Sequence, residues 1–393
     1  MNTSVTKQLI LAILIWVLCI GSGIPAMAAS GTPLTNNLYD VTANPRLVRI
    51  MHGEAKGAII ATVAPGAVYK STDDGRTFSK LTDIPFLSGT TWQCCGTLFE
   101  LPRQVGSLQA GTLLFSATFC AGTTASIDVY SSSDEGKNWT YHSTPVQRGE
   151  CNAQRHDGLW EPQFEVDSSG ALVMFWSDET DPRFSQKLAQ MRSVDGVRWQ
   201  GEKNTVASDN QKDRPGMAVV SKLPSWIYFM TYELCGPAQC TVFSRTSSDG
   251  WNFGPPSNVG NKIETAGGAY FEHAPRNLWF PASQSGDGAL LVVGQILYGK
   301  NGNVSPRDGQ VLFVNHTSDA SGKWEMIPAP VKVDVTAVPY NVCQNFSSAL
   351  LPIRNGTALL EMASDKNAVH VCTSYYASEP ATIISNPGGQ TIQ

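Results

Sequence analysis

The sequence is poor in charged residues and lacks several motifs that would identify common classes of protein. Asp, Glu, Lys and Arg make up 16% of the 393 residues, the net charge is −5, and no basic patch of the kind that nucleic-acid binding needs is present. No two cysteines have the C-x-x-C spacing, which argues against a zinc site. After residue 28 no segment is apolar enough to span a membrane, which takes about 20 residues. We therefore expect neither a nucleic-acid-binding nor a membrane-spanning protein, and no metal or other cofactor.

The first 28 residues have the features of a secretory signal peptide. Lys7 is the one charge before an apolar run from Leu9 to Ile20, and Ala26-Met27-Ala28 gives an A-x-A cleavage signal. The run is too short to cross a bilayer comfortably. We expect residues 1–28 to be removed and the mature protein, residues 29–393, to be secreted and extracellular.

Eight cysteines remain after the signal, and an even number in an exported protein favours disulfides. Cys235 and Cys240 are close enough to staple one loop, and Cys343 and Cys372 are placed to tie the end of the fold. Adjacent residues in a regular strand point to opposite faces, so Cys94 and Cys95 are expected to have different partners, or one of them to be free. Five N-x-[ST] sequons, some of them expected on surface loops, lie at Asn138, Asn303, Asn315, Asn345 and Asn355.

One short pattern recurs along the chain. Its clearest copy begins at Ser71, reads S-T-D-D-G-R-T-F and is matched position for position by a second copy. The Ser and Asp side chains are suited to hydrogen-bond the backbone of a tight turn, and the Gly is suited to a positive φ. The full, shortened and looser copies are 71–78, 132–139, 193–199, 247–253 and 317–324.

The copies recur at intervals of roughly 60 residues, with short strands of alternating character between them. Four short strands per interval is the content of one blade of a β-propeller. The repeat resembles the Asp-box of sialidase-type propellers, which usually have six blades. We therefore predict an all-β, six-bladed β-propeller with four antiparallel strands per blade: one domain over 29–393, with a short C-terminal tail. The last blade, near Cys343–Cys372, lacks a box, and residues 46–50 are expected to supply or approach a closing strand.

Two glutamates lie in strand-like apolar surroundings, where a carboxylate seldom occurs without a partner or a purpose. Glu161 lies in G-L-W-E-P, residues 158–162, and Glu233 ends the strand-like segment 229–235. Ligands bind at the central axis of a propeller, where the innermost strands converge. Both glutamates are therefore candidates for chemistry; the alternative is that they point to solvent from strand edges. The Asp residues of the boxes are expected to be structural.

The segments 159–162, 176–179, 213–217 and 232–235, together with three later stretches, resemble glycoside hydrolase family 93, the exo-arabinanases. The likeness runs from about Arg46 to Tyr376, and W-E-P followed by Y-E is its most specific part. Gln163 departs from it, since the family often has a second acidic residue there. The resemblance implies retaining cleavage of α-1,5-linked L-arabinan from the non-reducing end, with release of arabinobiose. It implies Glu161 as general acid/base and Glu233 as nucleophile, whose pKa values must be pushed apart.

Four further residues are candidate substrate ligands. Trp160 is suited to stacking on a furanose, or else to the core. Arg214 is suited to holding a carboxylate or a sugar hydroxyl, or else to pairing with Asp213. Tyr340 is placed to orient Glu233 or line the pocket, or else to pack. Gln295 is a candidate sugar ligand, whereas His156 and His273 are expected to be structural or rim residues.

Two other functions stay open. A true sialidase would need three arginines to grip the substrate carboxylate, and Arg49, Arg214 and Arg276 are the candidates. A non-catalytic carbohydrate-binding or protein-docking propeller would keep the boxes without needing both glutamates. In each case we expect a monomer.

Overall fold

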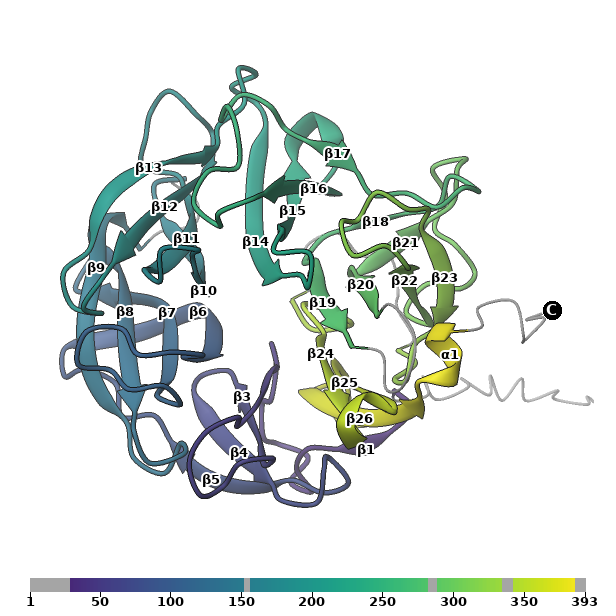
Figure 1. Cartoon of the computed structure of the whole chain (residues 1–393), viewed down its shortest axis with the longest axis horizontal. Coiled ribbons are helices and arrows are strands. Elements are labelled where there is room, and N and C mark those ends of the chain that lie inside the picture. Colours follow the sequence, from purple (N-terminus) through teal and green to yellow (C-terminus); the bar gives the residue numbers. More distant parts are fainter. Residues whose placement is uncertain (1–28, 152–155, 282–287, 334–341, 386–393) are drawn as a thin grey trace, which may run out of the picture.

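The computed structural model describes residues 29–151, 156–281, 288–333 and 342–385. Six antiparallel sheets stand around a central axis as the blades of a ring (Figure 1). The predicted six-bladed β-propeller is therefore confirmed. In each blade one strand lies nearest the axis and the other strands step outward from it. The blades are described below from the innermost strand outward.

The first three blades each use four consecutive strands. Blade one contains β2 (Arg46–Arg49), β3 (Ile59–Val63), β4 (Ala67–Ser71) and β5 (Ser79–Asp83). Blade two contains β6 (Thr90–Glu100), β7 (Leu113–Ala121), β8 (Thr124–Ser132) and β9 (Thr140–Glu150). Blade three contains β10 (Leu159–Val166), β11 (Leu172–Asp178), β12 (Lys187–Ser193) and β13 (Gln200–Val206).

The last three blades are less regular. Blade four contains β14 (Arg214–Lys222), β15 (Tyr228–Cys235) and β16 (Thr241–Ser247), with β17 (Asn261–Lys262), β18 (Tyr270–Glu272) and β21 (Ile296–Tyr298) at its outer edge. Blade five contains β19 (Arg276–Phe280), β20 (Ala289–Val293), β22 (Val311–Asn315) and β23 (Glu325–Pro328). Blade six contains β24 (Ala349–Ile353), β25 (Ala358–Lys366), β26 (Cys372–Pro380) and β1 (Thr32–Pro33).

Helical structure in the described residues is limited to α1 (Thr382–Ser385) and the 3-10 turns η2 (Gly236–Ala238) and η3 (Arg354–Gly356). Within these ranges no helix has the length and apolar character needed to cross a membrane.

The ring is closed by the N-terminal strand β1, which pairs with β26 at the outer edge of blade six. Residues 46–50 were expected to supply or approach a closing strand; they do not supply it, but Leu47 packs toward blade six. They form β2, the innermost strand of blade one, because Leu47 and Val48 pack toward blades six and two, respectively. The exposed dipeptide Thr32–Pro33 suits an outer edge, where a proline costs no ladder hydrogen bond.

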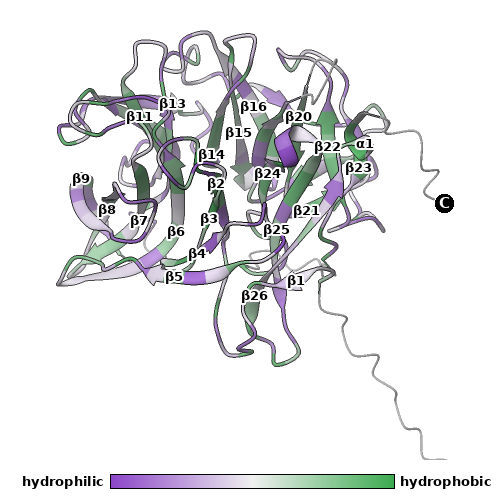
Figure 2. Cartoon of the chain, turned by 60° about the horizontal axis from the view of Figure 1, so that its bottom comes forward, coloured by the Kyte–Doolittle hydropathy of each residue, from purple (hydrophilic) through white to green (hydrophobic). Residues whose placement is uncertain are grey.

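Six hydrophobic clusters of the described residues lie one between each pair of neighbouring blades, and a smaller seventh packs Ala29 and Val331 against blade six. Strand β11 shows how one strand serves two clusters. Leu172, Met174 and Trp176 face blade two, while Val173 and Phe175 face blade four. Side chains alternate across a strand, so a blade buried on both faces needs such a continuous apolar run. Hydrophobic stretches run along strands such as β7 and β22 (Figure 2).

Each of the five boxes lies in the turn between the third and fourth strands of its blade, as predicted. In the first box Ser71 donates to Asp73, and the N–H groups of Gly75 and Thr77 donate to Ser71 and Asp73 at 2.9 Å. The Thr77 hydroxyl also donates to Asp73, at 2.6 Å, and this bond, followed by those from the Thr77 N–H and Ser71, lowers the pKa of Asp73 to about 2. We call the face of the ring that carries these turns the box face, and the opposite one the site face.

Four disulfides join Cys94–Cys95, Cys120–Cys151, Cys235–Cys240 and Cys343–Cys372. The last two were expected. The expectation that Cys94 and Cys95 have different partners, or leave one thiol free, is wrong, because β6 is not regular there. Its pairing with β7 shifts register on both sides of Cys94, and Cys95 has a φ of +68°.

Three of the five sequon asparagines, Asn138, Asn303 and Asn355, are exposed, as some were expected to be. Asn315 and Asn345 are buried, and both donate their side-chain amides to backbone carbonyls. A glycan on either amide nitrogen would have to replace those buried hydrogen bonds, whereas Asn303 and Asn355 are exposed and Asn138 is exposed but donates its amide to Asp134.

Candidate functional site

The glutamates singled out from the sequence lie together on the site face, next to the axis. Glu161 lies near the start of β10, the innermost strand of blade three. Glu233 lies near the end of β15 in blade four. The inner strands run parallel to the third strands, which end at the boxes. The start of β10 and the end of β15 are therefore both at the face opposite the boxes.

Irregular backbone directs the Glu161 side chain toward blade four. Glu161 has a φ of +59°, and the pairing of β10 with β11 shifts register between Trp160 and Gln163. The Glu161 carboxylate accepts hydrogen bonds at Oε2 from the Ser177 hydroxyl at 2.7 Å and from the Met217 backbone N–H at 2.9 Å. A left-handed φ in a glutamate is uncommon, and strands that bulge beside a site commonly re-aim a side chain in this way.

Gly216 brings the Glu161 carboxylate close to Glu233. Gly216 pairs with Glu233 across the ladder between β14 and β15. A Cβ on Gly216 would lie 3.5 Å from Oε2 of Glu161 and only 2.6 Å from Nε2 of Gln186. A Cβ at 3.5 Å would be in ordinary contact with Glu161, whereas the 2.6 Å approach means that the absence of a side chain makes room for Gln186. The Glu161 carboxylate thus lies against the strand position that pairs with Glu233.

The surroundings of Glu161 favour its protonated form. Burial and the negative charge of Glu233 raise the pKa of Glu161 to about 7, against the lowering effect of its two hydrogen bonds. A carboxyl with such a pKa holds a proton at mildly acidic pH and releases it near neutrality. This is the behaviour required of a group that serves as acid in one step and base in the next.

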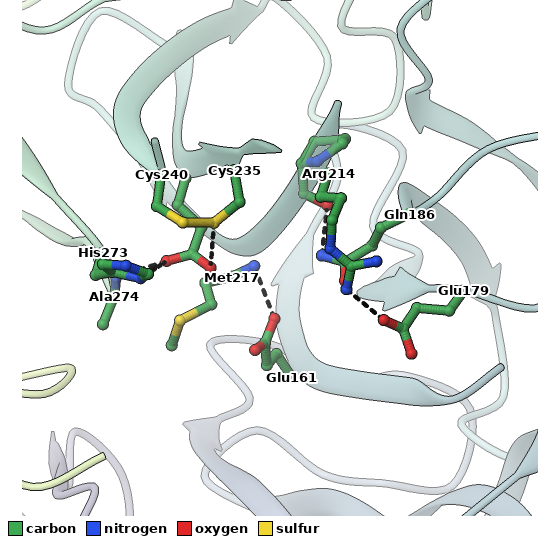
Figure 3. Close-up of a disulfide and its surroundings, with 11 residues drawn as sticks. Glu161, Glu179, Gln186, Arg214, Met217, Cys235, Cys240, His273 and Ala274 are labelled. Atoms are coloured by element: carbon green, nitrogen blue, oxygen red, sulfur yellow. Dashed lines mark hydrogen bonds and ion pairs between the residues drawn. A yellow bond between two sulfur atoms is a disulfide. The ribbon is translucent and has the colours of Figure 1, made fainter. Parts of the chain in front are cut away.

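Glu233 has different surroundings. Its Oε2 accepts a hydrogen bond of 2.8 Å from the backbone N–H of Ala274 and lies 3.5 Å from Nδ1 of His273 (Figure 3). Its Oε1 lies 3.4 Å from Sγ of Cys235, which is bonded to Cys240. The Cys235 and Cys240 sulfurs offer no thiolate to a metal, so this cluster does not form a typical metal site.

Glu179, at the end of β11, links two of the predicted substrate ligands. Its carboxylate accepts a hydrogen bond of 2.8 Å from Nε1 of Trp160. It also forms an ion pair with Arg214 (Figure 3). Arg214 also donates to Gln186 at 2.8 Å. The alternative pairing of Arg214 with Asp213 is not observed, since Asp213 is bound by Ser208 and Asn210 instead. Trp160 is half-buried and belongs to none of the blade cores, and so it lies at the rim of the site.

Below the glutamates a narrow cavity on the axis is lined by both Arg46 and Arg276, together with Cys95 and Gln163. Gln163 accepts hydrogen bonds from Thr97 at 3.1 Å and Arg276 at 3.5 Å. Burial lowers the pKa of Arg276 to about 10, which leaves the guanidinium charged at neutral pH. Charged donors therefore lie under the site, around Gln163. Position 163 is where the resemblance leads one to expect a second acidic residue.

The arginine triad of a sialidase is not assembled from the predicted residues. Arg49 ends β2 on the box face, where it forms a 2.5 Å ion pair with Asp74. Arg214 and Arg276 begin their strands on the site face. Because the length of an inner strand separates Arg49 from the other two, these three arginines do not converge on one ligand.

The other predicted residues are less central. Gln295 is buried, and its side-chain amide donates to the Gln344 carbonyl. Its backbone N–H donates to the His273 carbonyl. Tyr340 lies outside the described residues. His156 is an exposed rim residue 3.5 Å from Glu179, as expected, whereas His273 is largely buried against Glu233. Sequence reasoning missed Glu179 and Ser177, although both lie in segment 176–179 that carries the resemblance.

These elements define an Asp-box β-propeller with two glutamates at its axis. No model of a known protein family matches the chain, and no curated protein matches it. Among solved structures it is similar to the GH93 α-L-arabinofuranosidase of Fusarium graminearum, solved with arabinobiose. The identity is 20%, the alignment covers 92% of this chain and 99% of that one, and the TM-score is 0.71. It is also similar to the α-L-arabinanase of Penicillium chrysogenum complexed with arabinobiose, at 22% identity, 91% and 98% coverage and a TM-score of 0.72. These likenesses are of fold, over nearly the whole of each chain.

Proposed function

We propose that the protein is a secreted, retaining exo-glycoside hydrolase that releases arabinobiose from α-1,5-linked L-arabinan. One observation carries the proposal: Glu161 contacts the strand position next to Gly216, which pairs with Glu233, and burial and the charge of Glu233 favour the protonated form of Glu161. Retaining glycosidases use one protonated and one ionised carboxyl group in this way. Residues 29–393 would form a single catalytic domain.

The roles follow from the surroundings of each carboxyl group. Glu161 protonates the leaving oxygen, while Glu233 attacks the anomeric carbon and forms a covalent glycosyl-enzyme. Glu161 then takes a proton from the water that hydrolyses this intermediate. Ala274 holds Glu233 through its N–H, and Ser177 and Met217 hold Glu161.

Two features support the substrate class, and a third supports the location of the protein. The two similar propellers described above were each solved with arabinobiose. Trp160, tied to Glu179, offers a half-buried ring at the rim of the site, and Arg214 offers a guanidinium beside it. The four disulfides suit an oxidising, extracellular location. No cofactor is needed for this chemistry.

The decisive experiment is product analysis with linear and branched α-1,5-arabinan. We expect arabinobiose as the first product, formed in the anomeric configuration of the substrate, as followed by chromatography and by NMR of freshly formed sugar. A chromogenic sialoside serves as the comparison substrate. Release of sialic acid would support a sialidase instead, and binding of arabinan without turnover would support a carbohydrate-binding propeller.

A further inference from the structure

The segment between β18 and β19 crosses the site face with unusual backbone geometry. His273 and Ala274 have φ values of +63° and +47°, and neither is a glycine. Two consecutive left-handed residues outside glycine are costly and persist only where the surroundings fix them. Here the fixing contacts are the His273 N–H, which donates to the Cys240 carbonyl, and the His273 carbonyl, which accepts from Gln295, both at 2.9 Å.

This backbone places two groups on one oxygen of Glu233. The Ala274 N–H donates to Oε2 at 2.8 Å, and Nδ1 of the His273 ring lies 3.5 Å from the same atom. The Cys235–Cys240 disulfide borders the other carboxylate oxygen, since Sγ of Cys235 is 3.4 Å from Oε1. Figure 3 shows His273 and Ala274 on one side of the disulfide and Met217 with Glu161 on the other.

The charges around His273 are all negative. Glu233 from β15, Glu272 from β18 and Glu161 from β10 act on its ring, and the side chains of both His273 and Glu233 are only 11% exposed. Burial lowers the pKa of His273, but the hydrogen bond to Glu233 and the three negative charges outweigh it, so the pKa lies above its usual value. The imidazole in this position is therefore more readily protonated than a free one, and it lies beside the Glu233 carboxylate.

We propose that His273 is a positioning residue whose protonated ring keeps Glu233 ionised and oriented for attack. The inference rests on the proposed function, because it assigns a partner to the proposed nucleophile. It also explains the costly turn: a relaxed backbone at residues 273 and 274 would not bring the Ala274 N–H and the imidazole to one oxygen.

The first test is the His273→Asn variant, which removes the charge and keeps a donor near the position of Nδ1. With arabinan as substrate, kcat should fall about 3- to 10-fold while KM changes little, because a neutral hydrogen bond replaces a charge-assisted one that is roughly twice as strong. The acidic limb of the kcat profile should move to higher pH, since Glu233 loses the positive charge that favours its ionised form. An unchanged kcat and an unmoved limb would overturn the inference.

The matched control is His52→Asn. His52 also lies beside a glutamate, with Nδ1 3.1 Å from Oε1 of Glu100, but on the box face. This variant should keep the wild-type kcat and pH profile. Thermal unfolding of both variants shows whether the His273→Asn effect is merely a loss of fold; a folded variant with a lowered kcat supports the inference.

A second measurement does not depend on activity. NMR titration of the six histidine rings, with the His273 signal assigned by its absence in His273→Asn, should give a pKa above the usual value. In Glu233→Gln that pKa should fall. A His273 ring that titrates at its usual value in both proteins would overturn the inference. Failure of the wild type to cleave arabinan would overturn the proposed function, and the titration would still decide whether His273 and Glu233 are coupled.

Discussion

Met217 donates its backbone N–H to Oε2 of Glu161 at 2.9 Å, across the boundary between blades three and four. The residue before it, Gly216, pairs with Glu233. The start of β14 thus contacts both glutamates, since Met217 binds Glu161 and Gly216 pairs with Glu233. The distance between the two carboxyl groups is therefore set by backbone, and hydrogen bonds on each carboxyl group keep their environments different.

Removal of the Ser177 hydroxyl should shift the pH dependence of activity. Ser177 donates at 2.7 Å to Glu161, which stabilises the carboxylate and lowers its pKa. Since the general acid must be protonated, the alkaline limb of kcat/KM should lie near pH 7 in the wild type and move up by about one pH unit in Ser177→Ala. Ser364→Ala, which removes another buried hydroxyl in blade six, should leave the limb in place. An unmoved limb in Ser177→Ala would argue against Glu161 as the acid.

Glu161→Ala should discriminate between substrates according to their leaving groups. Without the acid, hydrolysis of arabinan should fall by about 100-fold or more, whereas an aryl arabinoside with an activated leaving group needs no proton and should suffer far less in the first step. Azide should restore turnover of the aryl substrate and give a product of retained configuration. Equal loss on both substrates, without azide rescue, would contradict the assignment.

Glu233→Ala should abolish turnover of every substrate, because no covalent intermediate forms without the nucleophile. Azide added to this variant should attack from the vacated side and give an adduct of inverted configuration, detectable by NMR. The stereochemistry separates the two glutamates: retained for Glu161→Ala, inverted for Glu233→Ala. Full activity in either variant would refute the two-glutamate mechanism and move attention to Tyr340 and the arginines.

Glu179→Ala should weaken substrate binding more than it slows the chemical step. Glu179 restrains Trp160 and Arg214, and its loss leaves a guanidinium without its main partner, a cost of about 1–3 kcal/mol. KM should rise about tenfold, with a smaller change in kcat, in steady-state kinetics on arabinan. The control is Glu202→Ala, which removes a more exposed arginine partner in β13, 2.6 Å from Arg148. A similar KM in both variants would show that Glu179 does not shape the site.

The six-bladed ring was predictable because its signal is local. A box such as 71–78 fixes its own turn through hydrogen bonds within eight residues, and the boxes mark the same turn in the first five blades. Glu161 and Glu233 could be singled out because they stand in apolar strands where a carboxylate seldom occurs without a partner or a purpose, and their catalytic role stays a prediction. Neither inference requires knowledge of which distant segments touch.

The contacts between residues on different strands were not predictable in this way. Ser177 and Glu179 act on residues 16 to 35 positions away, and His273 reaches Glu233 through a turn that no propensity favours. The error at Cys94 and Cys95 has the same origin. The alternation of strand side chains was applied to a stretch of β6 that loses its register, and only the register of β7 against β6 reveals this.

Glu361→Gln should stabilise the protein at alkaline pH and leave it nearly unchanged near pH 4. Glu361 is buried in β25, where its Oε2 accepts from the Val331 N–H at 2.9 Å, and burial raises its pKa to about 8 from 4.5. The folded state therefore holds this proton more tightly than the unfolded chain. The stability that it contributes is complete below about pH 4.5 and is lost as the pH rises to about 8.

A glutamine at position 361 keeps an acceptor for Val331 and has no proton to lose, so the difference in stability between variant and wild type should grow from pH 5 to pH 8. Because one pKa unit corresponds to about 1.4 kcal/mol, a gain of at least about 1 kcal/mol is expected at pH 8. Thermal and urea unfolding across this range measures it. Glu379→Gln, an exposed change in the neighbouring strand β26, serves as the control and should give no such trend. If the stabilities of wild type and Glu361→Gln depended on pH in the same way, the Glu361 carboxyl group would be solvated, because it is desolvation that raises its pKa.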